Sequence, residues 1–147
     1  QLTLLRKNLK AVIIGIVSGV LASMVSVLIF AKLFGLSHSE YVTLLPKSIT
    51  TAIGMGVSEE LGGLVTITVA VIIITGVLGN VIAEAVLKVA KIEEPIAKGL
   101  ALGTAAHAIG TAKALELGEI EGAMSSLSIA VAGLLTVVVV PLMSGLI

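Results

Sequence analysis

Long runs without a charged residue are the feature that most constrains how this chain folds. Residues 11–31 contain no charged side chain over 21 positions. At about 1.5 Å of rise per residue, a helix of this length matches the hydrocarbon core of a bilayer, which is roughly 30 Å thick. Residues 61–83 and 122–146 are also free of charged side chains. We therefore predict three membrane-spanning helices, at about 11–31, 61–83 and 122–146.

The composition supports a membrane environment. Hydrophobic residues make up 57% of the 147 residues, charged residues only 12%, and the mean hydropathy is +1.20, whereas soluble domains are about 25% charged. In water, a chain this short would expose contiguous apolar patches of a kind that soluble monomers avoid. We predict an all-α integral membrane protein with a single transmembrane domain over residues 1–147. Because the sequence begins at Gln1 rather than methionine, we expect it to be the C-terminal part of a longer chain and a fragment of a larger helical bundle.

Several functional classes are disfavoured. Nine Lys+Arg balance nine Asp+Glu, so the chain lacks the basic surface that binding to nucleic acid requires. It has no cysteine, which excludes disulfides, zinc–thiolate sites and cysteine nucleophiles. The sequence also lacks Gly-x-Ser-x-Gly, a P-loop and His-Glu-x-x-His. We predict that the protein is not an enzyme, with no catalytic residues, no metal ligands and no cofactor.

Two further apolar segments are too short to span a bilayer in full. They are PKSITTAIGMG at residues 46–56 and GLALGTAAHAIGTA at residues 99–112. We predict that both are re-entrant or broken helices, which must be enclosed by protein or line a wet cavity. Whether residues 99–112 cross or return cannot be decided from the charges around them. Paired interrupted segments between long helices are typical of the substrate sites of transporters.

The positions of basic residues predict the orientation. Basic side chains precede the first predicted span and follow the second, so both of these ends are expected on the cytoplasmic side. Residues 46–56 would then enter the membrane from the outer face. The residues concerned are Arg6, Lys7 and Lys10, and then Lys88, Lys91 and Lys98.

Lys47 is a charged residue inside a mostly apolar segment. Such residues usually face a protein interior, a cavity or a partner, because a charge in lipid is costly. If the segment is helical, Lys47, Thr50 and Thr51 lie within one arc of about 100°. The alternative is that Lys47 only extends to the membrane interface from the start of its segment.

His107 has Thr104 and Thr111 on the same helical face, at i−3 and i+4. A histidine changes charge near neutral pH, so a proton-coupled or anion-binding role is reasonable. The alternative is a neutral histidine held by hydrogen bonds between helices. Ser125, at the start of the last predicted span, has the same two alternatives: it donates to a substrate carboxylate or it bonds to a neighbouring helix.

Together these side chains suit a small carboxylate, which needs one cation and a few hydroxyl or amide donors. The predicted substrate-binding residues are Lys47, Ser48, Thr50, Thr51, Thr104, His107, Thr111 and Ser125.

Two stretches of the sequence resemble a known family. They are LPKSITTAIGMGVSEELGG and GLALGTAAHAIGTAKALELGEIEGAMSSLSIAVAGLLTVVVVP, within residues 44–141. Both resemble the LrgB/CidB family of antiholin-like, YohK-type membrane proteins. The resemblance implies plant relatives that are plastidial glycolate/glycerate translocators, bacterial relatives implicated in pyruvate transport, and others named as modulators of murein hydrolase activity and autolysis. It also implies a small holin-like membrane partner of the LrgA/CidA type, and further hydrophobic segments upstream. It assigns no binding residues.

From both lines of reasoning we predict a membrane carrier for small monocarboxylates of the pyruvate, glycolate or glycerate type, with coupling to protons or sodium left open. The alternative is an antiholin-like regulator of murein hydrolase activity and autolysis, which acts with the holin-like partner. In either case we expect a multi-pass, homo-oligomeric protein of a bacterial or archaeal inner membrane, in contact with the lipid bilayer.

Overall fold

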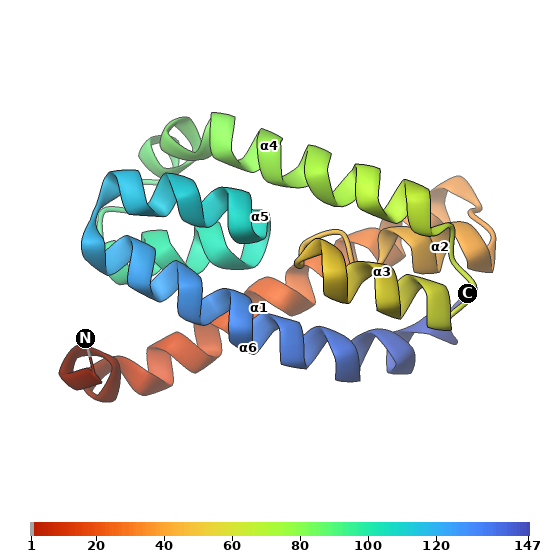
Figure 1. The fold of residues 1–147 in the computed structure, drawn as a ribbon, viewed down its shortest axis with the longest axis horizontal. Coiled ribbons are helices and arrows are strands. Elements are labelled where there is room, and N and C mark those ends of the chain that lie inside the picture. Colours follow the sequence, from red (N-terminus) through yellow and green to blue (C-terminus); the bar gives the residue numbers. More distant parts are fainter. Residues whose placement is uncertain (1) are drawn as a thin grey trace.

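The computed structural model describes residues 2–147, which form six helices and no strand (Figure 1). α1, α4 and α6 are long and apolar enough to cross a membrane. This confirms the predicted all-α membrane fold with three spanning helices. The helices are α1 Leu2–Phe34, α2 His38–Leu44, α3 Thr51–Glu60, α4 Val65–Val89, α5 Pro95–Leu117 and α6 Glu119–Ser144.

The long helices bury one narrow face each and expose apolar side chains on the other. α1 buries residues that recur every three or four positions, which is the helical repeat: Val12, Ile16, Val20, Met24, Val27 and Ala31. Its opposite face exposes large side chains such as Ile29 and Leu33, and only 17% of the most apolar part of α4 is buried. Exposed apolar faces of this extent are stable against lipid tails and costly against water.

α2 and α3 form a hairpin that enters and returns on the same side. The Ser39 hydroxyl donates to the carbonyl of Gly62 at 2.9 Å, so the start of α2 lies beside the end of α3. α2 begins with a capping box, in which the backbone N–H of Glu40 donates to the Ser37 hydroxyl and the backbone N–H of Ser37 donates to the Glu40 carboxylate. The Ser37 hydroxyl also donates to this carboxylate. The hydrogen bonds that Ser37 donates to the carboxylate lower the pKa of Glu40, and the bond from the Ser37 backbone has the larger effect.

The tip of this hairpin is a turn over residues 45–50, and α3 begins only at Thr51. The expectation that Lys47, Thr50 and Thr51 share one helical face is therefore wrong. Pro46 has no N–H to donate to a helical hydrogen bond, and the N–H of Lys47 bonds the carbonyl three residues earlier, at Leu44, as in a tight turn.

α5 is a second hairpin. His107 has φ 43° and ψ −134°, which is not helical, and it separates an arm over residues 95–106 from an arm over residues 108–117. Gly110 packs so closely on the Leu102 carbonyl that a Cβ would lie 2.5 Å from it, whereas residues eight apart in a continuous helix are about 12 Å apart. Both arms also contact α6 at Ser125. α5 therefore turns back at His107, and residues 99–112 do not cross.

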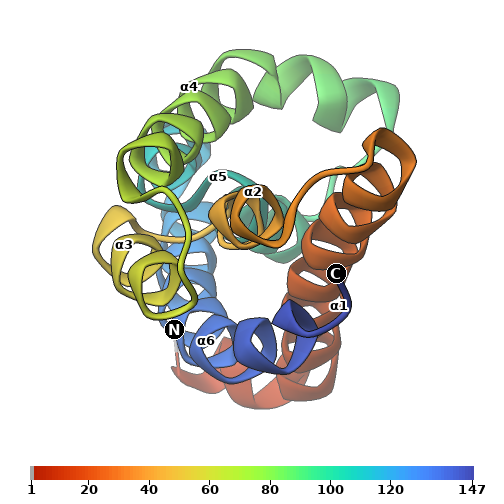
Figure 2. The same cartoon turned by 90° about the vertical axis from the view of Figure 1, so that its right-hand side faces the viewer.

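Glycines allow the first arm of α5 to pack closely on both sides. A Cβ on Gly103 would lie 2.5 Å from the carbonyl of Ser125 in α6, and a Cβ on Gly19 of α1 would lie 2.6 Å from the Thr104 hydroxyl. Small residues let membrane helices approach this closely. Figure 2 shows α2 in the centre, with α5 behind it, inside a ring made by α1, α3, α4 and α6.

The two hairpins enter from opposite ends of the bundle. The His38 ring at the start of α2 lies 3.0 Å from the carbonyl of Ile147, so the α2–α3 hairpin starts at the end that holds the C-terminus. Asn8 of α1 and Glu94, just before α5, line one cavity, so α5 starts at the end that holds the N-terminus. The two chain ends lie at opposite ends of the molecule (Figure 1).

Candidate functional site

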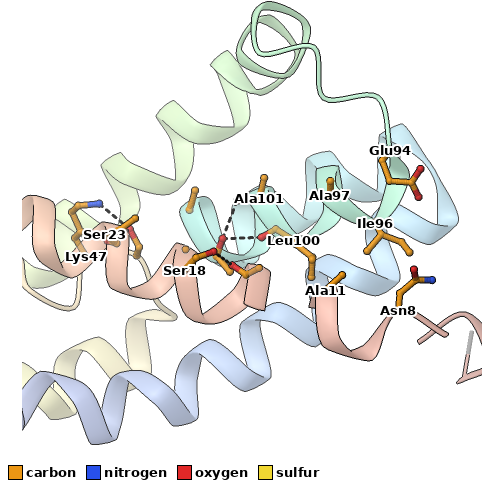
Figure 3. Close-up of a pocket in the computed structure, with 16 residues that line it drawn as sticks. Asn8, Ala11, Ser18, Ser23, Lys47, Glu94, Ile96, Ala97, Leu100 and Ala101 are labelled. Carbon is orange, nitrogen blue, oxygen red and sulfur yellow. Dashed lines mark hydrogen bonds between the residues drawn. The ribbon is translucent and has the colours of Figure 1, made fainter. Parts of the chain in front are cut away.

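An open-sided cavity of about 800 Å³ lies between α1 and the first arm of α5, and Lys47 and Ser48 at the tip of the α2–α3 hairpin line one end of it. Most of its lining consists of glycine, alanine and serine. Figure 3 shows Lys47 at one end, and Asn8 and Glu94 at the other. The cavity therefore runs along the bundle from the N-terminal end of α1 toward the hairpin tip.

Lys47 and two serines form the polar end of the cavity. The Lys47 ammonium donates to Ser48 Oγ at 2.9 Å, and the Ser23 hydroxyl of α1 donates to the same oxygen at 3.0 Å. Ser48 thus accepts two hydrogen bonds, and its own hydroxyl hydrogen remains available to another acceptor. The ammonium also has two further N–H groups, because Ser48 takes only one.

Among the described residues 2–147, no carboxylate forms a salt bridge with this ammonium. Within residues 2–147 the salt bridges are those that Lys113 makes with Glu84 and Glu116. Lys47 is half-buried and is the one basic side chain that lines the cavity, while Glu94 lies at the far end. A partly desolvated cation with spare donors favours an anion, because a buried charge is costly unless it is paired.

Thr104 is the third predicted residue at this cavity. It is buried on the first arm of α5, faces Gly19 and donates to the Leu100 carbonyl at 2.8 Å. Its hydroxyl oxygen still has capacity to accept a hydrogen bond from a bound molecule. The structure therefore brings together Lys47 and Ser48, which are adjacent in the chain, and the distant Thr104.

His107 does not line this cavity. It is buried, and its Nε2 lies 2.9 Å from the Ile72 carbonyl of α4. A carbonyl only accepts, so Nε2 carries the proton and donates. The ring packs on Gly76, where a Cβ would lie 2.7 Å from Cε1. In this position His107 attaches the tip of the α5 hairpin to the middle of α4.

The other predicted residues also lie outside the cavity lining. Thr111 and Ser125 form a buried hydroxyl pair at 2.6 Å between the second arm of α5 and α6. Thr50 and Thr51 are half-buried at the start of α3, where the Thr50 side chain makes no capping hydrogen bond. These four hydroxyls therefore lie at helix contacts and a helix end.

Ser23 is a cavity residue that the sequence reasoning missed. It lies in the first predicted span, where an isolated serine among apolar residues gives a weak signal. Ser18, five positions earlier, lines the same cavity. Hydroxyls within an otherwise apolar span are the feature that would have directed attention to this face of α1.

The family comparison covers nearly the whole chain. The model of the LrgB-like family matches residues 1–146. This chain belongs to the LrgB family. The assignment agrees with the resemblance carried by the Pro-Lys-Ser stretch at the first hairpin tip and by the stretch around His107.

Relatives of this LrgB-family chain have holin-like and antiholin-like names. The holin-like protein CidB of Staphylococcus epidermidis is 42% identical over 139 residues, which are 95% of this chain and 61% of that protein. The antiholin-like protein LrgB of Bacillus mycoides is 42% identical over 142 residues, which are 97% of this chain and 62% of that protein. The chain thus spans about three fifths of the length of these relatives. No solved structure matches it.

Proposed function

We propose that this chain forms the substrate-binding part of a membrane carrier for small monocarboxylates of the pyruvate, glycolate or glycerate type. The observation that supports this most is the Lys47 ammonium, which lies at the hairpin end of the cavity with no salt bridge to a carboxylate within residues 2–147. A carboxylate would accept from Lys47 and from the hydroxyl of Ser48, and these are charge-assisted hydrogen bonds.

The architecture supports transport as well. Two hairpins enter from opposite ends, and each breaks within the bundle, at residues 45–50 and at His107. Interrupted helices that meet near the middle of the membrane are a recurring way to bind substrates in secondary transporters. Coupling to protons or sodium remains a prediction, and so does a role of His107 in it.

The test is uptake of labelled pyruvate and glycolate into proteoliposomes that contain the full-length protein. We expect saturable uptake that Lys47→Ala abolishes and Lys47→Arg partly retains, because arginine keeps the charge but changes its geometry. Lys32→Ala, in the last turn of α1 and outside the cavity lining, is the control and should transport normally. If the Lys47→Ala variant took up substrate with the same kinetics as the wild type, the proposed binding site at Lys47 would be refuted.

The names of the relatives favour a second function over the first. CidB and LrgB are described as holin-like and antiholin-like proteins, and neither name indicates an enzyme. On this second proposal the protein regulates murein hydrolase activity and autolysis in a bacterial inner membrane by contacting a small holin-like partner. The exposed apolar faces of α1 and α4 would then make the functional contacts, either with a second copy of this chain in a homo-oligomer or with the holin-like partner.

The two functions differ in what Lys47 does. If the protein only regulates a partner, Lys47→Ala should leave co-purification with the holin-like protein and the rate of cell lysis unchanged. If the lysis effect follows from transport, Lys47→Ala should change the lysis rate while co-purification persists. Measuring both quantities in the same cells separates the alternatives.

A further inference from the structure

A second cavity lies away from the first, at the end of the bundle where α4 finishes and α5 begins. It has a volume of about 460 Å³ and shares no lining residue with the first cavity. Leu87, Ile92 and Leu117 give it an apolar part. Its charged lining residues are Lys88, Lys91, Lys98, Glu84 and Glu93.

The positive charges at this cavity outweigh the available negative ones. Glu84 forms a salt bridge with Lys113 at 2.5 Å. Within residues 2–147 no salt bridge joins Lys88, Lys91 or Lys98 to a carboxylate. Three ammonium groups from the end of α4, the connection and the start of α5 therefore share a cavity whose lining carries two carboxylates, Glu84 and Glu93.

The backbone at Lys91 points to a role for its side chain. Lys91 has φ 54°, in the left-handed region that favours glycine. It follows the end of α4 in the turn where the N–H of Ile92 bonds the carbonyl of Leu87 at 2.9 Å, and glycine is the usual residue at such a position. The sequence thus places an ammonium beside the cavity where the backbone alone would favour a residue without a side chain.

We propose that this cavity binds the phosphate-bearing headgroup of an anionic phospholipid. It lies where α4 leaves its apolar stretch, which is the level of the headgroups if α4 spans the bilayer. Basic pockets between membrane helices at this level suit such headgroups. On the last turns of α4, Val81, Val86 and Val89 are exposed and offer an apolar surface to the acyl chains of the same lipid.

The experiment measures binding of phosphatidylglycerol to the full-length protein in a neutral detergent, by thermal stabilisation and native mass spectrometry. Phosphatidylcholine and inorganic phosphate are the comparison ligands. The variants are Lys91→Gly, Lys98→Gln and the two combined, and the control is Lys32→Gln, at the other end of the bundle. Lys91→Gly suits the left-handed backbone, so the variant should unfold at no lower temperature than wild type without lipid.

We expect phosphatidylglycerol to bind and stabilise the wild type more than phosphatidylcholine does. Its affinity should fall by about fivefold for each lysine removed, as is typical of a basic residue near an anionic surface, and Lys32→Gln should bind normally. Equal affinity in Lys91→Gly, Lys98→Gln and wild type would overturn the proposal. Equal stabilisation by inorganic phosphate would also overturn it, because the site would then bind a soluble anion.

Discussion

At the scale of single residues, the chemistry of the first cavity depends on one oxygen. Ser48 Oγ accepts from both Lys47 and Ser23, and this holds the ammonium against the cavity wall. A hydroxyl that accepts two hydrogen bonds is oriented to donate its own hydrogen elsewhere. Ser23 therefore positions Ser48 and, through it, Lys47.

Replacing Ser23 tests this arrangement. Ser23→Ala should raise the KM for carboxylate uptake by about fivefold, because a neutral hydrogen bond contributes about 1 kcal/mol, while the capacity for uptake persists. Ser18→Ala is the matched control: Ser18 lines the same cavity but donates to the Gly15 carbonyl of its own helix. The measurement is the KM for carboxylate uptake in each of the two variants. An equal change in both would mean that Ser23 has no special role.

At the scale of elements, the two hairpins are held in different ways. The α2–α3 hairpin is held by buried hydroxyls: Thr68 of α4 bonds Ser58 at 2.7 Å and the carbonyl of Thr43 at 3.0 Å. The α5 hairpin is held at its tip by two contacts with α4. His107 contacts the Ile72 carbonyl, and the Asn80 amide donates to the Ile109 carbonyl at 2.9 Å.

The turn at His107 predicts which of two variants at this position is the more stable. His107→Gly and His107→Ala both lose the bond to Ile72, but only glycine adopts a positive φ without strain. The glycine variant should be more stable by about 1 kcal/mol, measured by thermal unfolding in detergent. In a continuous helix the order reverses, because alanine exceeds glycine by about 1 kcal/mol. An alanine variant that is the more stable would refute the hairpin.

At the scale of the whole molecule, the lysines are distributed unevenly. Four lysines lie at the end of the bundle where α4 finishes and where α5 begins and ends: Lys88, Lys91, Lys98 and Lys113. The basic start of α1 lies at the same end. The opposite end carries one lysine, Lys32, and the carboxylates Glu59 and Glu60. Basic residues mark the cytoplasmic side. The distribution therefore predicts that the α5 hairpin enters from the cytoplasmic face and the α2–α3 hairpin from the outer face.

Labelling of introduced cysteines tests this topology, since residues 1–147 contain no cysteine. Because α5 turns back, Glu94→Cys and Glu116→Cys should react with a membrane-impermeant reagent from the same, cytoplasmic side. Glu59→Cys should react from the outside. Reaction of Glu94→Cys and Glu116→Cys from opposite sides would show that α5 crosses the membrane.

The class of fold and the pattern of long and short segments could be predicted from the sequence alone. Burial in lipid depends on the length and apolarity of a continuous segment, so the three spans could be recognised locally. The shortness of residues 46–56 and 99–112 is likewise a local property, which is why broken or re-entrant segments could be predicted at both places. The family resemblance also came from local motifs.

Which polar side chains contact one another could not be predicted from the sequence and follows from the packing of the helices. Lys47, Ser48 and Thr104 share a cavity with Ser23, whereas His107, Thr111 and Ser125 form contacts between helices. The direction of α5 was equally hidden, because its turn is made by a histidine with a positive φ rather than by a glycine or proline. A side chain's partners depend on how helices distant in sequence pack and turn, and that packing is set by the whole bundle.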